Sequence, residues 1–462
     1  MKSDDTYQAT LDYLYSYVDF SLSRSFRNAP EHFDLGRMHD LMKALGNPEL
    51  EYPIIHIAGT KGKGSVAAFC SSALFSGGYN VGLYTSPHLH DYAERIQING
   101  EPISHEDLVN IVERVKPIIE NIPKITTFEI TTALALLYFA NNNVDVAVLE
   151  VGLGGRLDAT NVVTPTVSVI TSLSYDHTYV LGDTLAEIAG EKAGIIKPGI
   201  PVVVSPQNDE ALLVIERIAY ERSSPLVKVG LDCRFKPLDQ SLDGQSLLIE
   251  AVETFHIHVG NVKTVDRDDT EPINLFIPLL GYHQVENAAT AFTALRVFGE
   301  RALPLEINSI REGFAKTEWP GRFEILCRDP LFVVDSAHNR DSINKLRFTI
   351  EDYFPGKEVI LLFGASEDKD ISGMISDLSP LVREVIATES YHPRAMEVEQ
   401  IVEIVNELNK PVRCVPDVAD ALRVALKLTD DDALTLATGS LFIAAGAREA
   451  WMAREINRID GK

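Results

Sequence analysis

Short apolar runs that end in glycine, serine or aspartate alternate with longer segments of helical period along most of the chain. Such runs are typical of strands that are buried on both faces of a parallel sheet covered by helices. In the first part of the chain the expected strands are 54–58, 81–85, 144–150, 167–171 and 202–205. In the second part they are 331–335, 359–363, 384–388 and 433–437. The pattern therefore predicts an α/β fold.

The chain is too long for one ordinary core, because it has 462 residues of which 45% are apolar. Between 207 and 278 short runs interrupted by polar residues predict antiparallel strands in an inserted β unit, and a helix is expected over 285–298. A second series of strands and helices begins near TEWPG, where Pro320 and Gly321 would interrupt any helix. We therefore expect two domains, 1–316 and 317–462.

The overall charge and the cysteines exclude several classes of protein. With 42 Lys and Arg against 67 Asp and Glu, the formal charge of −25 disfavours nucleic acid and anionic membranes as partners. Cys70, Cys233, Cys327 and Cys414 are widely separated, which predicts neither a disulfide framework nor a zinc ribbon. The N-terminal residues lack the pattern of a signal peptide, and no apolar run is long enough to span a membrane. A soluble, cytoplasmic protein is expected.

The segment IIHIAGTKGKGSVAAFCSSALF (54–75) has the order of strand, glycine-rich turn and helix that a phosphate-binding loop requires. Glycines let the backbone approach phosphate oxygens, and the N-terminus of the helix favours an anion. Lys63 could reach the terminal phosphates, and Ser65 offers a hydroxyl to phosphate or to Mg²⁺. The spacing departs from G-x-x-x-x-G-K-[ST], because Ile57 replaces the first glycine and Gly64 follows the lysine. A turn that binds nothing remains the alternative.

Phosphoryl chemistry would require Mg²⁺, and polar residues at strand ends could provide its oxygen ligands. Glu150 ends an apolar run, so a parallel strand would place its carboxylate at the edge of the sheet where ligands gather. Ser86 and His88 follow one expected strand, and Asp176 and His177 follow another. Histidine is an unusual ligand for this ion, and each of these residues taken singly is more often a capping or surface residue.

Ten segments, in this order along the chain, resemble folylpolyglutamate synthase and the bifunctional dihydrofolate synthase of the Mur ligase superfamily. They are GTKGKGS (59–65), TSPHL (85–89), TTFE (126–129), LEVGLGGRLDATN (149–161), DHTYVLGDT (176–184), EKAGIIK (191–197), HQVENA (283–288), WPGRFE (319–324), DSAHN (335–339) and TGSLF (438–442). The resemblance implies a P-loop ATP-binding domain at 1–316 and a Rossmann-like ligase domain at 317–462.

The reaction implied by the resemblance joins L-glutamate to dihydropteroate or a reduced folate. ATP would phosphorylate the substrate carboxylate, and the glutamate amine would attack the acyl phosphate to give an amide, ADP and phosphate. The implied cofactors are ATP and Mg²⁺, with two metal ions expected, and the implied state is a monomer. The alternative is a Mur-type ligase that joins an amino acid to another carboxylate substrate.

Matching the motifs assigns a role to each candidate residue. The implied ATP site comprises Gly62, Lys63, Gly64, Ser65, Asn287, Arg322 and Asp335. The implied Mg²⁺ ligands are Ser86, Glu150 and His177. The implied catalytic residues are Lys63, Lys192 as a carbamate, and His338 near the acyl phosphate. The implied pterin pocket contains Thr126, Phe128 and Asp158, and the segment FDLGRMHDL (33–41) could contribute near it.

Some assignments keep an alternative, and two positions depart from the family pattern. Lys192 could instead be a helix-surface lysine paired with Glu187 or Glu191. Phe128 could equally be an ordinary core residue. In the family motifs asparagine is common where this chain has a lysine at 61, and glycine is more usual where it has a serine at 336. Neither departure removes a catalytic group.

Overall fold

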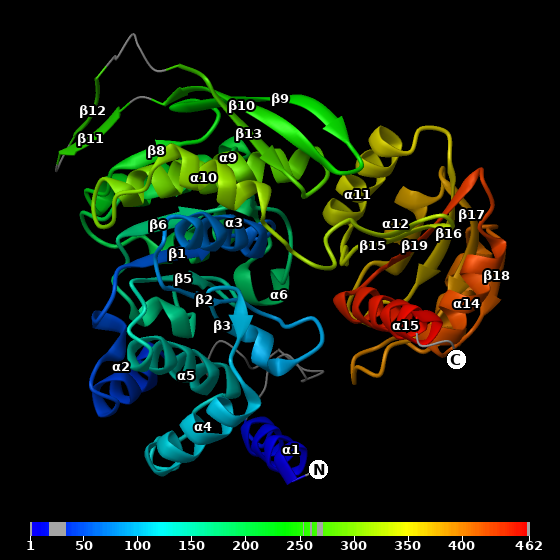
Figure 1. The fold of residues 1–462 in the computed structure, drawn as a ribbon, viewed down its shortest axis with the longest axis horizontal. Coiled ribbons are helices and arrows are strands. Elements are labelled where there is room, and N and C mark those ends of the chain that lie inside the picture. Colours follow the sequence, from blue (N-terminus) through cyan, green and yellow to red (C-terminus); the bar gives the residue numbers. More distant parts are fainter. Residues whose placement is uncertain (1, 18–33, 253, 259–260, 266–270, 460–462) are drawn as a thin grey trace. The chain divides into compact units, whose positions relative to one another are not determined.

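The computed structural model describes residues 2–17, 34–252, 254–258, 261–265 and 271–459, which form two compact units (Figure 1). The first unit comprises Met1–Gln240, Gly244–Pro278 and His283–Thr317. The second unit comprises Ser241–Asp243, Leu279–Tyr282 and Glu318–Lys462. Each unit contains its own sheet and is described by itself.

The sheet of the first unit has eight strands, and its central strand β1 lies between β5 and β6. Six neighbouring strands, from β2 to β8 in spatial order, are parallel, whereas β3 and β4 add an antiparallel edge. The spatial order is β4 (Glu101–Pro102), β3 (Ile96–Ile98), β2 (Val81–Tyr84), β5 (Val146–Glu150), β1 (Ile54–Ala58), β6 (Val167–Ile170), β7 (Val202–Val204) and β8 (Leu226–Lys228). The predicted strands of the first part are present, with ends that differ by one or two residues.

Helices cover both faces of this sheet, as expected for buried parallel strands. Figure 1 shows α3 and α10 side by side on one face, and α4 and α5 on the other. The longer helices of this unit, of nine residues or more, are α1 (Lys2–Tyr15), α2 (Leu35–Ala44), α3 (Lys63–Ser76), α4 (His105–Ile119), α5 (Thr127–Asn141), α8 (Asp209–Glu221), α9 (Tyr282–Gly299) and α10 (Ile307–Ala315). Shorter ones are α6 (Thr178–Leu181), α7 (Leu185–Lys192), η2 (Pro48–Leu50), η3 (Tyr92–Arg95), η4 (Ala159–Val162) and η5 (Ala193–Ile195).

An antiparallel β unit is inserted between β8 and α9, and it confirms part of the prediction for 207–278. Strand β10 (Gly244–Val252) pairs antiparallel with β13 (Ile273–Ile277) and lies beside β9 (Cys233–Ser241). Strands β11 (Thr254–His258) and β12 (Asn261–Val265) form a separate antiparallel pair.

The first residues of the predicted insertion do not belong to it. Residues 209–221 form α8, and β8 extends the parallel sheet. The reason is the spacing of the buried residues Ala211, Ile215 and Ala219, which repeat every four positions along one helical stripe. The polar interruptions in this segment therefore mark the exposed face of a helix and not breaks between strands.

The second unit has a six-stranded sheet that is parallel except for β14 at its edge. The spatial order is β14 (Glu324–Arg328), β15 (Leu331–Val334), β19 (Ala433–Thr438), β16 (Glu358–Phe363), β17 (Val382–Ala387) and β18 (Val412–Cys414). Its helices are α11 (Arg340–Tyr353), α12 (Ile371–Leu378), α13 (Val398–Glu407), α14 (Val418–Leu428) and α15 (Leu441–Ile459). Separate hydrophobic clusters lie on the two faces of the sheet, one with α11, α12 and α13 and one with α14 and α15. The predicted α/β fold, with a Rossmann-like C-terminal part, is confirmed.

Replacing Gly313 tests the close packing of α10 on α3. A Cβ atom at this position would lie 2.3 Å from the Cα atom of Ala73, so the two backbones approach too closely for a side chain. We expect Gly313→Ala to lower the free energy of unfolding by about 1–3 kcal/mol, measured by urea denaturation. The control is Gly190→Ala in α7, where no atom lies within 4 Å of the added Cβ. Equal effects of the two substitutions would contradict the packing argument.

Candidate functional site

The loop between β1 and α3 depends on two glycines that no other residue could replace without strain. Gly59 and Gly62 have φ angles of 153° and 87°. A Cβ atom on Gly59 would lie 1.8 Å from Oγ1 of Thr171, and one on Gly62 would lie 2.2 Å from Oδ1 of Asn287. The fold therefore places Asn287, from α9, directly beside the glycine loop, as its predicted role in the ATP site requires.

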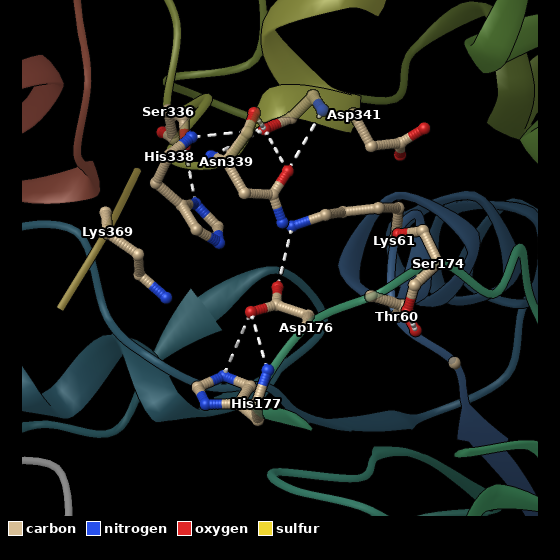
Figure 2. Close-up of polar contacts among 12 residues, drawn as sticks. Thr60, Lys61, Ser174, Asp176, His177, Ser336, His338, Asn339, Asp341 and Lys369 are labelled. Atoms are coloured by element: carbon tan, nitrogen blue, oxygen red, sulfur yellow. Dashed lines mark hydrogen bonds and ion pairs between the residues drawn. The ribbon is translucent and has the colours of Figure 1, made fainter. Parts of the chain in front are cut away.

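The same loop is tied to the segment that follows β6. The backbone N–H groups of Thr60 and Lys61 both donate to the carbonyl oxygen of Ser172, at 3.0 Å each. The hydroxyl of Thr60 donates to the carbonyl oxygen of Ser174 at 3.2 Å. Nζ of Lys61 lies 3.1 Å from Oδ2 of Asp176, as Figure 2 shows. The additional cation at position 61 thus has a carboxylate partner within the first unit.

Helix α3 begins directly after Gly62, so its first turn faces whatever the loop binds. The first amides of a helix have no acceptor within the helix and carry its positive dipole end, which suits a phosphate. Ser65 is buried in this turn. Nζ of Lys63 lies 3.7 Å from Oε1 of Glu150, so the lysine lies between the loop and the end of β5.

Glu150 and Ser86 meet because β5 and β2 are parallel neighbours whose C-terminal ends lie at the same edge. The backbone N–H of Ser86 donates to Oε2 of buried Glu150 at 3.2 Å. Over the described ranges, no group of three or more His, Cys, Asp and Glu side chains is placed to hold a metal ion. One carboxylate and one hydroxyl still fit Mg²⁺, which usually keeps water and substrate phosphates as its other ligands.

His177 follows β6 and has a left-handed backbone with φ of 50°. Its backbone N–H donates to Oδ1 of Asp176 at 3.0 Å, and its Nε2 lies 3.8 Å from the same oxygen. Its Nδ1 lies 3.2 Å from the hydroxyl oxygen of Tyr179. Figure 2 shows the ring beside Asp176. These contacts connect His177 to Lys61 through Asp176, and its role as a metal ligand remains a prediction.

Lys192 is the last residue of α7, and its side chain is buried against the glycine loop. Its Nζ donates to the carbonyl oxygen of Gly59 at 2.9 Å. Burial, and after it the nearby charge of Lys63, lower the pKa of this lysine to about 7, although Asp176 and Asp158 act in the opposite direction. A large fraction of the side chain is therefore an uncharged amine at neutral pH.

The alternative of a surface ion pair for Lys192 is wrong. Glu191 forms its ion pair with Arg156 at 2.9 Å, and Glu187 accepts hydrogen bonds from the start of α7, where it completes a capping box with Thr184. The helix turns both glutamates away from the buried face that carries Lys192. Periodicity alone could not show which face of so short a helix is buried.

Thr126 begins α5 and has a structural role in this position. Its hydroxyl accepts the N–H of Glu129 at 3.2 Å, and the Glu129 carboxylate accepts the N–H of Thr126 at 2.8 Å. Arg37 pairs with Glu129 at 2.9 Å, so part of the segment 33–41 does lie against this turn, whereas Phe33 lies outside the described residues. The capping box fixes where the next residues of α5 point.

Phe128 is half-buried and lies over the loop that follows β5. A Cβ atom at Gly152 would lie 2.4 Å from Cζ of Phe128, so the ring occupies the space that the glycine leaves. The ring centroid of Phe128 lies 6.2 Å from that of Tyr84. Gly152 was not among the predicted site residues, and only the density of glycines in LEVGLGG hinted at a close approach here.

Asp158 closes the same loop and is buried. Its Oδ2 accepts the N–H of Leu153 at 2.8 Å, and its Oδ1 accepts both the N–H of Thr160 at 3.0 Å and the hydroxyl of Thr160 at 2.5 Å. Burial raises the pKa of Asp158, although these hydrogen bonds and the charge of Lys63 act in the opposite direction. The ring of Phe128, from α5, and the carboxylate of Asp158 thus both contact the loop after β5, and their role in a pterin pocket remains a prediction.

In the second unit, Asp335 fixes the backbone next to two predicted site residues, Arg322 and His338. Its Oδ2 accepts the N–H of Phe323, which directly follows Arg322, and its Oδ1 accepts the N–H of Ala337, each at 2.8 Å. Phe323 has a left-handed φ of 43°, and this hydrogen bond holds that strained conformation. Asp335 and Arg322 therefore lie on adjoining loops of one unit.

The serine at 336 links those two loops. Its buried hydroxyl donates to the carbonyl oxygen of Gly321 at 2.7 Å, and its N–H donates to the same oxygen at 3.0 Å. Nδ1 of His338 lies 2.9 Å from the carbonyl oxygen of Ser336 (Figure 2). A carbonyl only accepts, so Nδ1 carries the proton and Nε2 of the neutral ring is an acceptor.

Alanine at position 62 tests the closeness of the glycine loop to Asn287. Gly46 has nearly the same φ, 88° against 87° at Gly62, but no atom lies within 4 Å of its added Cβ. We expect Gly62→Ala to weaken binding of a non-hydrolysable ATP analogue at least about tenfold by calorimetry, because the loop must move away from Asn287. Gly46→Ala carries the same backbone strain and should leave the affinity within about twofold. Unchanged affinity in Gly62→Ala would contradict this geometry.

Comparisons with known proteins agree with this arrangement. Residues 57–295 match the Mur ligase middle domain, and 321–441 match the Mur ligase glutamate ligase domain. The dihydrofolate synthase/folylpolyglutamate synthase of Bacillus subtilis (strain 168) is 35% identical over 90% of this chain and 94% of its own. The Mycobacterium tuberculosis folylpolyglutamate synthase complexed with ADP is 31% identical over 97% of this chain and 99% of its own, with a TM-score of 0.85. E. coli FolC in complex with DHPP and ADP is 29% identical over 97% of this chain and 98% of its own, with a TM-score of 0.83. The chain belongs to the folylpolyglutamate synthase and dihydrofolate synthase family of Mur ligases.

Proposed function

We propose that this protein is an ATP-dependent ligase that adds L-glutamate to dihydropteroate and to reduced folates. The observation that carries the proposal is the position of Lys63, which follows Gly62 in the glycine loop at 59–65 and extends its Nζ to 3.7 Å from the carboxylate of Glu150. The loop after β5, which the ring of Phe128 contacts at Gly152 and which Asp158 closes, begins directly after that glutamate. The relatives named as dihydrofolate synthase/folylpolyglutamate synthase support this choice over a Mur-type ligase for another carboxylate.

The chemical difficulty of the reaction is that a carboxylate has no good leaving group. Transfer of the terminal phosphoryl group of ATP to one carboxylate oxygen gives an acyl phosphate and ADP. Attack by the neutral amine of glutamate forms the amide bond, breaks the bond from carbon to the phosphate oxygen, and releases inorganic phosphate and a proton. The amides at the start of α3 and Nζ of Lys63 stabilise the charge on the transferred phosphoryl group.

Ser86, Glu150 and His177 would hold Mg²⁺ beside this loop. When bound, Mg²⁺ neutralises phosphate charge and polarises the transferred group. The carboxylate of Glu150 is held in position by the protein, because one of its oxygens lies near Lys63 and the other accepts the N–H of Ser86. Gly62, Gly64, Ser65 and Asn287 complete the phosphate site in the first unit. For Arg322 and Asp335, in the second unit, the proposed role is also the binding of ATP.

The loop after β5 supplies the pocket for the pterin ring. Phe128 offers an aromatic face, and Asp158 offers carboxylate oxygens that accept ring N–H groups. Thr126 acts by fixing the first turn of α5 and thereby the position of Phe128. In the second unit, His338 presents Nε2 as the acceptor for the amino group of glutamate, because Nδ1 is held by Ser336.

Lys192 carries a carbamate in the active enzyme. Its neutral amine adds to the carbon of CO₂, and loss of one proton leaves an anionic carbamate at the end of the side chain. The lowered pKa of Lys192 supports this step, since an ordinary lysine is almost fully protonated at neutral pH. The new negative charge would lie beside Lys63 and could balance a second Mg²⁺ ion.

The predictions for partners and location complete the proposal. A monomer in the cytoplasm that binds small molecules and no nucleic acid follows from the family resemblance and from the formal charge of −25. Within the part of the chain that the structure describes, no helix has both the length and the apolar content of a membrane span.

Substrate-dependent ADP formation tests the proposed reaction. We expect ADP release only when glutamate is present with dihydropteroate or with a reduced folate, and a glutamylated product in each case. Lys63→Ala should lower kcat at least about 10²–10³-fold in a folded protein, because the lysine acts on the transferred phosphoryl group. Lys228→Ala is the matched control, because this lysine also pairs with a glutamate, Glu216, at 3.1 Å, but lies in the edge strand β8. ADP formation with UDP-linked acids alone would reassign the protein to another Mur ligase.

Carbon-13 NMR with labelled bicarbonate tests the carbamate. We expect one carbamate signal that is lost in Lys192→Ala, whose activity short-chain carboxylic acids should partly restore. Because the pKa of Lys192 is about 7, the signal and the activity should both fall as the pH decreases below 7 and the amine becomes protonated. Lys197 is an internal control: burial lowers its pKa to about 8, but Lys197→Ala should retain the signal. Full activity without any carbamate signal would exclude the carbamate.

A further inference from the structure

A buried histidine in the central strand of the first unit is connected to the pterin-pocket acid. His56 lies in the middle of β1 with no exposed surface, in a run that is otherwise apolar. Its Nε2 lies 2.8 Å from Oγ1 of Thr160, which is also fully buried. Oγ1 of Thr160 lies 2.5 Å from Oδ1 of Asp158. The three side chains form one hydrogen-bonded chain from the core of the sheet to the pocket.

The direction of this chain follows from the protons available. Oδ1 of Asp158 accepts both the backbone N–H and the hydroxyl of Thr160, so the single proton of that hydroxyl points to Oδ1. Oγ1 of Thr160 must then accept from His56, which requires a proton on Nε2. Among the described residues, Nδ1 of His56 has no hydrogen-bond partner. The reverse direction would leave a buried N–H without an acceptor, which is costly.

We propose that His56 is a positioning residue for Asp158 and that it acts through Thr160. The proposal rests on the proposed role of Asp158 in binding the pterin ring. His56 is neutral, because burial and, to a smaller extent, the charge of Lys197 lower its pKa to about 3. A neutral Nε2–H donor fixes the Thr160 hydroxyl toward Asp158 at every pH at which the enzyme works.

The consequence is selectivity for a ligand that donates hydrogen bonds. Both oxygens of Asp158 accept from the protein, through Leu153 on one side and Thr160 on the other, so the carboxylate cannot rotate. Its remaining lone pairs can only accept from a ligand. A nitrogen heterocycle with neighbouring N–H groups satisfies them, whereas a ring that offers only acceptors leaves them unpaired in a buried site.

Kinetic constants for each substrate separate this role from a general structural one. We expect Thr160→Val and His56→Leu to raise the KM for dihydropteroate about tenfold, with the KM values for ATP and glutamate within about twofold of the native enzyme. His56→Gln should restore most of the affinity, because its side-chain amide can donate from nearly the position of Nε2. Thr349→Val in α11 removes an equally buried hydroxyl, one that donates to the carbonyl of Lys345, and should change none of the three. An equal rise in all three KM values, or no rise, would overturn the proposal.

A second measurement needs no substrate and therefore separates this proposal from the proposed reaction. Nitrogen-15 NMR of histidine-labelled protein, with the His56 signals identified by their loss in His56→Gln, reports the tautomer directly. We expect the Nε2–H tautomer, with no protonation of the ring down to about pH 5. A proton on Nδ1 would overturn the role of His56 even in an active enzyme. If His56 has the expected tautomer but the protein does not use dihydropteroate, the proposed reaction is refuted. The hydrogen-bonded chain from His56 through Thr160 to Asp158 is then still supported.

Discussion

The parallel pairing of β1 with both β5 and β6 is the constraint on which the site in the first unit depends. Its register places Ile57 opposite Glu150 and Ala58 opposite Ile170, so all three strands end at the same edge. Three loops leave the sheet there: the glycine loop, the loop that leads to Asp158, and the segment that leads to His177. Residues that lie about 90 to 120 positions apart in the sequence become neighbours because their strands are adjacent.

Charge compensation at this edge explains how so acidic a chain can hold an anionic nucleotide. Lys61 and Lys63 each have a carboxylate partner, Asp176 and Glu150. The polar contact of Lys192 is with a backbone carbonyl, and its pKa falls to about 7. These partners differ in their effect on a buried ammonium group. A carboxylate stabilises its charge, whereas a carbonyl dipole offsets only part of the free-energy cost of removing that charge from water. The formal net charge of −25 therefore says little about the electrostatic field at the loop.

The sequence predicted those parts of the structure that depend on local pattern. The strands were predicted because buried parallel strands are short apolar runs, and the glycine loop was predicted from its flanking strand and helix although its spacing is unusual. The helix at 209–221 was missed because polar residues on its exposed face resembled breaks between strands. The capping role of Thr126 could have been read from the T-x-x-E pattern, which is itself a signature of a helix start. For contacts distant in sequence the local signal is weak: the glycines of LEVGLGG hinted at a close approach, but nothing local showed that the ring of Phe128 lies over Gly152.

The two departures from the family pattern have a common physical explanation. Lys61 lies at the start of the glycine loop and pairs with Asp176, in the segment after β6. Ser336 donates its hydroxyl to the carbonyl of Gly321, in the loop before β14. In each case a polar side chain joins two loops of the same unit and satisfies a group that would otherwise need water or another partner. The two residues therefore affect how firmly neighbouring loops are held together, and neither position coincides with Lys63, Glu150, Asp335 or His338, to which we assign roles in the proposed reaction.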